Sequence, residues 1–337
     1  MSSRVHSCLL LLLLLSLAFA PASEAYHDEG AAGLRQSLLA FDRLGRFDCQ
    51  GGLRCLLLES YHDSIVGLHL QTTERSVNPR TLQPQPLDLH QRDIGAEWPM
   101  VALTMVGSLR LSHVAYVLAR VIEDRVPGDF IECGAWRGGA SLMASLSLRL
   151  LEESHLRQVH VADSFEGLPE KRYADSPGWD GWHRLDYLRV SRQEVERNYQ
   201  AFGIDVVGQS PSQHGVHFHE GYFVDSLPRA RQPGGALSDQ EARPLAVIRL
   251  DGDMYDSVMD VLFHLYDRLS IGGWVVLDDY PDVGETQQAV DDFRAWHDIE
   301  EPITCACQTK TCCEARAGYV WQKQREIEGG VDWDLYQ

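Results

Sequence analysis

Five short runs of apolar or alternating residues constrain the fold of this chain more than any other feature. They predict β-strands at 129–133, 158–162, 214–219, 245–250 and 273–277. Between them, apolar residues recur at helical spacing, as over 139–151, 191–202 and 255–269. Strands that alternate with helices favour a mainly parallel sheet with helices on both faces. We therefore predict an α/β fold of the Rossmann-like type.

The first residues predict a secretory signal peptide. Arg4 and His6 precede an apolar run, and residues 18–20 supply small side chains for cleavage. The run is too short for a comfortable membrane span. We assign residues 1–25 to a cleaved signal, expect no stable membrane span afterwards, and place the protein in the secretory pathway or outside the cell. An uncleaved anchor and a bipartite plastid signal are the alternatives.

An excess of acidic residues excludes two classes of partner. The 337 residues include 30 Lys and Arg against 49 Asp and Glu, which gives a formal net charge of −19. Such a chain is repelled by nucleic acid and by anionic membrane surfaces. We therefore expect neither as a partner.

Cysteine usage fits an oxidising compartment. Removal of Cys8 with the signal leaves seven of the eight cysteines, so at least one is unpaired. Cys133 lies inside an apolar strand and is predicted to be a buried free thiol. Cys49 and Cys55 bracket a glycine-rich loop that could close into a disulfide. Four further cysteines lie at 305, 307, 312 and 313. Their spacing differs from that of structural zinc sites, so we expect disulfides rather than zinc.

Carboxylates follow two of the predicted strands. Asp251 comes directly after the run 245–250, while Asp278 and Asp279 follow 273–277. Ligands bind at the carboxyl ends of the strands in an open α/β sheet. Carboxylate oxygens favour a hard cation such as magnesium over zinc or copper. The sequence therefore predicts an enzyme with a metal at this edge of the sheet.

A glycine-bearing turn after the first strand indicates a nucleotide-like cofactor. The turn spans 134–139 and places Trp136 where a dinucleotide site needs its second glycine. That bulk would obstruct a pyrophosphate, so a cofactor without one fits better. Asp163 ends the second strand, at the position where an acidic residue accepts hydrogen bonds from a ribose. Together these features favour S-adenosylmethionine.

Four segments in the same order resemble the macrocin O-methyltransferase family. They are 129–139, 162–169, 249–257 and 272–280, and the resemblance extends over about 55–322. It implies a class I methyltransferase fold and the use of S-adenosylmethionine and magnesium to methylate sugar hydroxyls. The chain departs from the family at Cys133 and Ala135, in its cysteine-rich tail and in its signal peptide. The tail and the signal put the natural acceptor in doubt.

Carried over by position, the resemblance implies magnesium ligands at Asp251, Asp278 and Asp279. Because neighbouring strand residues point to opposite faces, Asp278 and Asp279 can reach one ion only if the strand ends there. Asp253 and Asp256 are expected to serve in the turn or as N-cap residues of the next helix. The residues expected to contact the cofactor are Thr104, Met105, Glu132, Gly134, Trp136, Asp163 and Ser164.

Methyl transfer to a sugar needs a deprotonated hydroxyl. Magnesium bound to two neighbouring hydroxyls would lower their pKa and orient the nucleophile, and Asp251 could take the proton. We assign no histidine as base, since His113, His183 and His219 are better interpreted as surface or packing residues. The aromatic loop 179–182 has the composition of a carbohydrate-facing lid, or it anchors a long loop.

Two other functions remain as alternatives. One is a catalytically silent protein that binds metal or glycan, and the other is a metal-dependent hydrolase. The expected partner is a small-molecule or glycan acceptor, with a homo-oligomer as an open alternative. The predicted division of the chain is a signal at 1–25, an irregular N-terminal extension or lid at 26–98, the methyltransferase domain at 99–325 and a tail at 326–337.

Overall fold

A computed structural model describes most of the chain beyond the predicted signal. The described residues are 29–41, 47–50, 52–70, 74–79, 81–172, 176–179, 181–206, 215–238, 243–306 and 318–336. The signal peptide lies outside them and stays a prediction. Within the described residues, no helix is both long and apolar enough to span a membrane.

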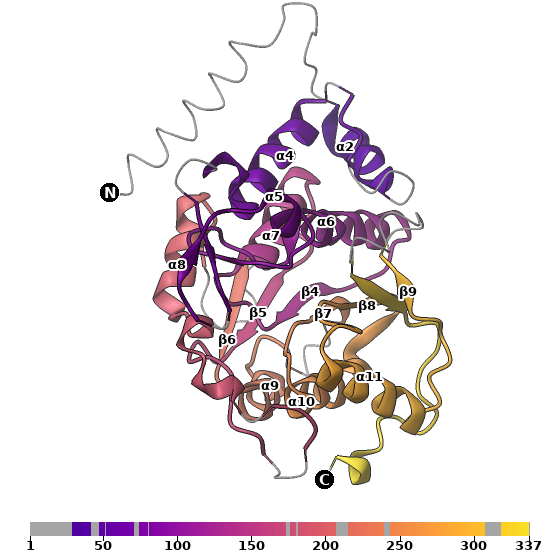
Figure 1. Ribbon diagram of the computed structural model, residues 1–337. Coiled ribbons are helices and arrows are strands. Elements are labelled where there is room, and N and C mark those ends of the chain that lie inside the picture. Colours follow the sequence, from indigo (N-terminus) through magenta and orange to yellow (C-terminus); the bar gives the residue numbers. More distant parts are fainter. Residues whose placement is uncertain are drawn as a thin grey trace, which may run out of the picture.

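A seven-stranded sheet forms the centre of the molecule (Figure 1). Five neighbouring strands are parallel, and β10 and β9 add an antiparallel edge. The order across the sheet is β6 (Val216–Glu220), β5 (Val159–Asp163), β4 (Asp129–Cys133), β7 (Leu245–Leu250), β8 (Leu269–Leu277), β10 (Tyr319–Gln322) and β9 (Thr304–Cys305). The chain moves outward from β4 to β6 and then returns to β7. The switch point between β4 and β7 is where such sheets bind ligands.

The parallel α/β fold predicted from the sequence is confirmed, with one strand longer than expected. Strands β4 and β7 have the predicted bounds, whereas β8 begins at Leu269 rather than at 273. Gly272 and Gly273 suggested a strand start, but the pairing register with β7 shifts between Leu245 and Val247. An irregularity of this kind lets a strand continue through glycines.

Helices cover both faces of the sheet (Figure 1). Three of these helices pack on the sheet through one hydrophobic cluster, and three others pack on it through a second cluster. The first group is α6 (Gly107–Glu123), α7 (Gly139–Leu150) and α8 (Arg192–Ala201), and the second is α9 (Phe223–Arg231), α10 (Tyr255–Leu265) and α11 (Gly284–Trp296). Short 3-10 helices lie at Leu68–Leu70 (η1), Trp182–Arg184 (η2), Asp186–Leu188 (η3), Tyr266–Arg268 (η4) and Trp333–Leu335 (η5).

The N-terminal extension is more regular than predicted. Helix α2 (Gly30–Leu39) packs on α6, and α4 (Leu53–Val66) packs on α6 and α7 as an outer layer (Figure 1). The sequence indicated a helix only near 56–65. Leu34 and Leu38 of α2 are fully buried, so tertiary packing stabilises a helix whose two glycines weaken its intrinsic propensity.

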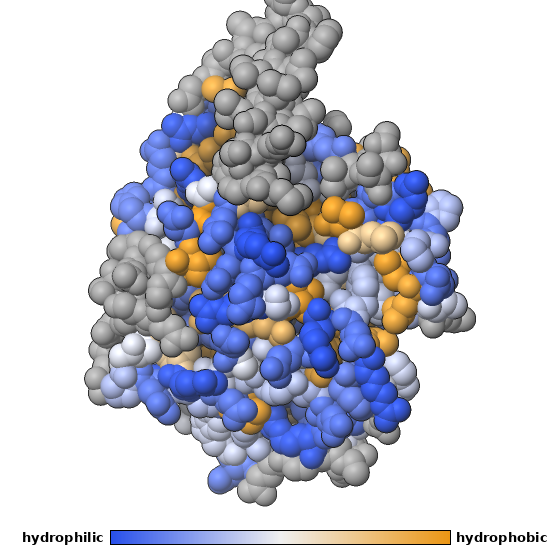
Figure 2. Space-filling model, turned by 90° about the vertical axis from the view of Figure 1, so that its left-hand side faces the viewer, coloured by the Kyte–Doolittle hydropathy of each residue, from blue (hydrophilic) through white to orange (hydrophobic). Residues whose placement is uncertain are grey.

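The rest of the extension forms a small antiparallel sheet and one short helix. Strand β1 (Ser76–Val77) pairs with both β2 (Pro84–Gln85) and β3 (Trp98–Pro99), and α5 spans Leu89–Asp93. On the face that Figure 2 presents, hydrophilic side chains predominate and hydrophobic ones form separate patches. That distribution agrees with the acidic composition.

The cysteine predictions are confirmed where the structure describes them. Cys49 and Cys55 form a disulfide, and Cys133 is a buried free thiol. Cys305 is also disulfide-bonded. The other three cysteines of the tail, at 307, 312 and 313, lie outside the described residues.

A buried glutamate holds the segment that leads to the sheet edge. The Glu74 carboxylate accepts hydrogen bonds from the backbone N–H groups of Met100 (2.9 Å) and Ala102 (2.8 Å). It also lies 3.7 Å from the Arg92 guanidinium, and both side chains are buried. A buried carboxylate with these donors replaces the water it loses on folding. Glu74 therefore fixes the backbone of residues 100–102.

We expect Glu74→Gln to lower the free energy of unfolding by about 3 kcal/mol, because it breaks a buried, hydrogen-bonded charge pair. Urea denaturation measures the change. Glu152→Gln is the matched control, since its exposed ion pair with Arg54 should contribute less than about 1 kcal/mol. Equal losses in the two variants would contradict the assignment.

Candidate active site

Strand register brings four charged side chains to one face of the sheet. Glu132 of β4 lies opposite Arg249 of β7, and Arg249 lies opposite Val276 of β8. Asp251 follows Arg249 by two residues and Asp278 follows Val276 by two. Since side chains alternate along a strand, all four charged residues point the same way.

Arg249 links these carboxylates by short hydrogen bonds. Its Nη1 donates to Glu132 Oε1 and to Asp251 Oδ2, both at 2.7 Å. Its Nη2 donates to Asp278 Oδ1 at 2.5 Å, and Arg110 of α6 donates to Asp278 Oδ2 at 2.7 Å. Arg249 itself is only 1% exposed. The carboxyl ends of β4, β7 and β8 are therefore joined through one buried guanidinium group.

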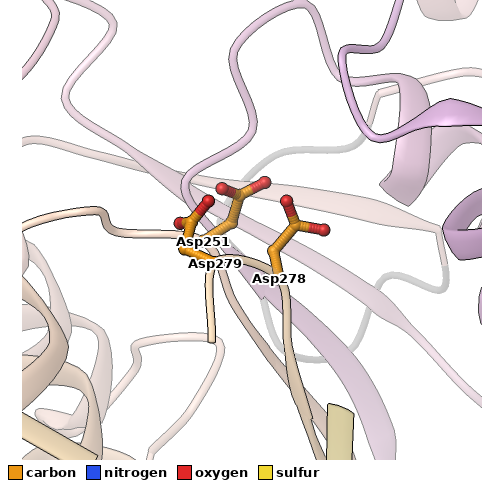
Figure 3. A group of neighbouring side chains, drawn as sticks. All are labelled: Asp251, Asp278 and Asp279. Atoms are coloured by element: carbon orange, nitrogen blue, oxygen red, sulfur yellow. The ribbon is translucent and has the colours of Figure 1, made fainter. Parts of the chain in front are cut away.

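The three predicted metal ligands converge. Asp251, Asp278 and Asp279 each offer a carboxylate oxygen, and these oxygens lie within 4.8 Å of one another. Figure 3 shows the three side chains projecting in the same direction from the ends of neighbouring strands. Strand β8 ends at Leu277, and the Asp278 N–H still donates to the Leu250 carbonyl oxygen of β7 at 3.0 Å. The extended strand does not continue to Asp279, so the alternation no longer separates the two adjacent aspartates.

The charges of this cluster do not balance. Five carboxylates face the two arginines, a formal excess of three negative charges, and they belong to Glu132, Asp251, Asp253, Asp278 and Asp279. Asp279 Oδ2 is buried and has no hydrogen-bond partner among the described residues. A buried, unpartnered carboxylate oxygen beside other carboxylates fits a hard divalent cation.

The same excess raises carboxyl pKa values. Burial, together with the charge of Asp278, raises the pKa of Asp251 to about 6. Burial and the charge of Asp251 raise the pKa of Asp253 to about 8. The pKa of Asp279 is raised well above its ordinary value by burial and by Asp253. Each shift shows that the site favours added positive charge, as protons or as a metal ion.

The turn after β4 approaches Asp251 too closely for any side chain. Gly134 has a φ of +94°, and a Cβ there would lie 1.6 Å from the Asp251 carbonyl oxygen. The Asp163 carboxylate accepts hydrogen bonds from the N–H groups of Ala135 (2.7 Å) and Trp136 (3.2 Å). The Asp163 carboxylate therefore holds the turn at the end of β5 by these two hydrogen bonds.

A cavity of about 270 Å³ opens beside this turn. Five of the seven predicted cofactor residues line it, and Asp251 and Asp253 border it as well. These five are Met105, Gly134, Trp136, Asp163 and Ser164.

The other two predicted cofactor residues lie outside the cavity lining. Thr104 is buried and its Oγ1 accepts a hydrogen bond from Val106 N–H at 3.3 Å. Glu132 uses one oxygen for Arg249 and the other for the N–H of Ser141 at 2.9 Å. Both support the residues that form the wall.

Sequence reasoning missed part of the cavity wall. Tyr222, Phe223 and Val224, at the start of α9, line the cavity directly after β6. These residues could have been predicted from the sequence, because the residues that follow each parallel strand lie at the same edge of the sheet. Helix α9 was missed because Pro228 interrupts its pattern.

A second group of missed residues lies at the base of the loop between β5 and α8. Arg172 donates to both oxygens of Asp260 at 2.5 Å, and Asp256 accepts from Arg172 N–H and from Ser176 Oγ, both at 2.8 Å. Asp256 therefore does not cap α10, whose N-cap residue is Met254 without a side-chain bond. The expected N-cap role of Asp256 is wrong because its carboxylate accepts its hydrogen bonds from Arg172 and Ser176 of the loop.

The predictions for two histidines are confirmed. His113 is 1% exposed, and burial with the charge of Arg249 lowers its pKa to about 3. His219 is buried and its ring stacks on that of His160 at 5.2 Å. Neither lines the cavity.

Comparisons with known proteins agree with this geometry. The family model described as macrocin-O-methyltransferase (TylF) matches residues 59–312. A tetracenomycin rhamnosyl 4'-O-methyltransferase of Streptomyces olivaceus is 41% identical over 221 residues, which is 64% of this chain and 77% of that protein. Demethyldecarbamoylnovobiocin O-methyltransferase of Streptomyces niveus is 37% identical over 238 residues, 69% of this chain and 80% of that protein.

A solved structure shows the same fold. That of the O-methyltransferase NovP has a TM-score of 0.65 and 32% identity, and the alignment covers 81% of this chain and 100% of NovP. The chain therefore belongs to the macrocin O-methyltransferase family and is an S-adenosylmethionine-dependent O-methyltransferase.

Proposed function

We propose that this enzyme methylates a hydroxyl of a sugar or glycosylated small molecule, with a magnesium ion at Asp251, Asp278 and Asp279. The observation that carries the proposal is the convergence of these three carboxylates, one with an unpartnered buried oxygen, beside the cavity that Asp251 also lines. Relatives support the acceptor class. Two are named as methyltransferases acting on a rhamnosyl tetracenomycin and on mycinamicin III.

The residues of the chain organise this chemistry around Asp251. A cation held by the three carboxylates would act as a Lewis acid on acceptor hydroxyls. Arg249 fixes one oxygen of Asp251 and one of Asp278 at hydrogen-bond distance, so these ligands are oriented before any cation arrives. Because Asp251 lies between the cavity and the carboxylate cluster, a methyl donor in the cavity and an acceptor at the cluster would meet there.

Asp253 is a better proton acceptor than Asp251. Asp251 already accepts a hydrogen bond from Arg249 and would share its charge with a cation, which makes it a weak base. Asp253 borders the cavity, and among the described residues no ion pair engages its carboxylate. Its φ of 55° is unusual for a residue other than glycine, and Thr286 Oγ1 donates to its carbonyl oxygen at 2.9 Å, which holds this turn. A raised pKa suits a group that must take up a proton.

The alternatives explain less of the site. A silent binding protein does not agree with the relatives, which are named as O-methyltransferases. A metal-dependent hydrolase would not need the turn at 134–139, nor the hydrogen bonds by which Asp163 holds that turn.

We expect Asp279→Asn to lower the rate of methyl transfer at least about 100-fold, because it removes a ligand oxygen and one negative charge from the cluster. Initial rates are measured with excess magnesium, and calorimetry measures S-adenosylmethionine binding, which should persist. Chelation by EDTA should abolish activity in the parent enzyme and magnesium should restore it. Asp282→Asn, an exposed aspartate three residues away, is the control. Full activity of Asp279→Asn in EDTA would refute the metal site.

Asp253→Asn should reduce kcat by about 100-fold or more while the affinities for S-adenosylmethionine and magnesium stay within a factor of three. Pre-steady-state rates and calorimetry separate the two effects. If the variant retained the parent kcat, Asp253 would not be the base.

Magnesium should stabilise the enzyme more at about pH 8 than at about pH 6. The folded pKa of Asp251 is raised to about 6 and that of Asp253 to about 8, so the folded chain holds protons that the unfolded chain has released. Their contribution to stability is therefore lost as pH rises through those values, and a cation then replaces the protons. Differential scanning calorimetry with and without magnesium measures the shift in Tm. A shift independent of pH would count against this linkage.

A further inference from the structure

Two tryptophans lie together on the loop that follows β5. Trp179 is 55% exposed, and its ring meets that of Trp182 edge to face with centroids 5.5 Å apart. A single exposed apolar side chain needs no explanation. A pair anchored by the helix that also contacts Asp253 is different, because its apolar surface is held in water without burial.

Glu285, in the first turn of α11, anchors this pair. Its Oε1 accepts hydrogen bonds from the Trp179 N–H (3.0 Å) and from the Trp182 Nε1–H (3.2 Å). At Gly178, which has a φ of +101°, a Cβ would lie 2.1 Å from Glu285. Glycine is therefore needed for the approach of the loop to the helix. Since Glu285 accepts a hydrogen bond from the indole N–H of Trp182, which is only partly exposed, the aromatic surface that the pair presents to solvent belongs mainly to Trp179.

The same turn of α11 contacts the backbone of Asp253. Thr286, the neighbour of Glu285, donates through Oγ1 to the Asp253 carbonyl oxygen at 2.9 Å. The negative charge of Glu285 is also among those that act on the Asp253 carboxyl. Adjacent residues of one helical turn thus hold the tryptophan pair on one side and the Asp253 turn on the other.

We propose that Trp179, braced by Trp182 and Glu285, is the platform on which the pyranose ring of the acceptor stacks. This inference rests on the proposed function and specifies how its acceptor is held. A pyranose has one face of C–H groups and a rim of hydroxyls, so its apolar face matches an indole ring while its hydroxyls reach acidic side chains. The platform would supply the apolar half of that recognition and the carboxylates of Asp251, Asp278 and Asp279 the polar half.

Methyl α-L-rhamnopyranoside, which has vicinal hydroxyls and no aromatic aglycone, is the probe. Trp179→Ala should raise its KM at least about 10-fold and change kcat less than about threefold, since stacking orients the ring without taking part in the reaction. Trp179→Phe keeps an aromatic face and should stay within about threefold of the parent KM. Trp296→Ala, at another partly exposed tryptophan on α11, is the matched control and should leave KM unchanged. Calorimetry with S-adenosylmethionine should give the same affinity for all variants.

Saturation-transfer NMR supplies a readout that does not depend on turnover. Magnetisation should pass from the parent protein to the ring protons of the sugar, and Trp179→Ala should abolish the transfer. A parent KM in Trp179→Ala, no sugar binding to the parent enzyme, or an effect confined to p-nitrophenyl α-L-rhamnopyranoside would each overturn the platform. Binding that depends on Trp179 without any methyl transfer would instead overturn the proposed function and leave the platform intact.

Discussion

The buried guanidinium of Arg249 is the interaction on which the rest of the site depends. Glu132, Asp251 and Asp278 lie on or directly after three neighbouring strands, and each forms an ion pair with this one group. Without it, these carboxylates would lie together at a largely buried sheet edge, where mutual repulsion and lost hydration would be unfavourable. Three negative neighbours raise the pKa of Arg249 still further above its ordinary value. Arg249 is therefore a permanent positive charge at the switch point of the sheet.

Arg249 and Arg110 neutralise only part of the acidic cluster. Two arginines pair with Glu132, Asp251 and Asp278, while the carboxylates of Asp253 and Asp279 stay without an ion pair among the described residues. This excess of negative charge destabilises the cation-free fold, as is common at functional sites. Partial neutralisation orients the ligands yet leaves a net attraction for a divalent cation.

Segments far apart in the chain frame the cavity. Trp98, at the end of the N-terminal extension, stacks on Tyr187 of the loop between β5 and α8, with ring centroids 4.8 Å apart. At the other end of the loop, Asp260 binds Arg172 and accepts a hydrogen bond from the Tyr336 hydroxyl in the C-terminal tail. The extension and the tail thus both contact the loop, whereas α2 and α4 cover the far side of α6 and α7 (Figure 1). Within the described part of the predicted extension or lid at 26–98, Trp98 contacts this loop.

The sequence by itself determined the parallel sheet, the acidic ends of β7 and β8, and the glycine turn after β4. Each depends on neighbours in the chain: apolar runs form strands, and a residue that follows a strand must lie at its end. Tertiary structure alone decided that Arg249 joins three strands, that Asp253 faces the cavity, and that Thr104 and Glu132 lie behind its wall. These outcomes follow from strand register and from the packing of distant segments, and no local pattern encodes either of them.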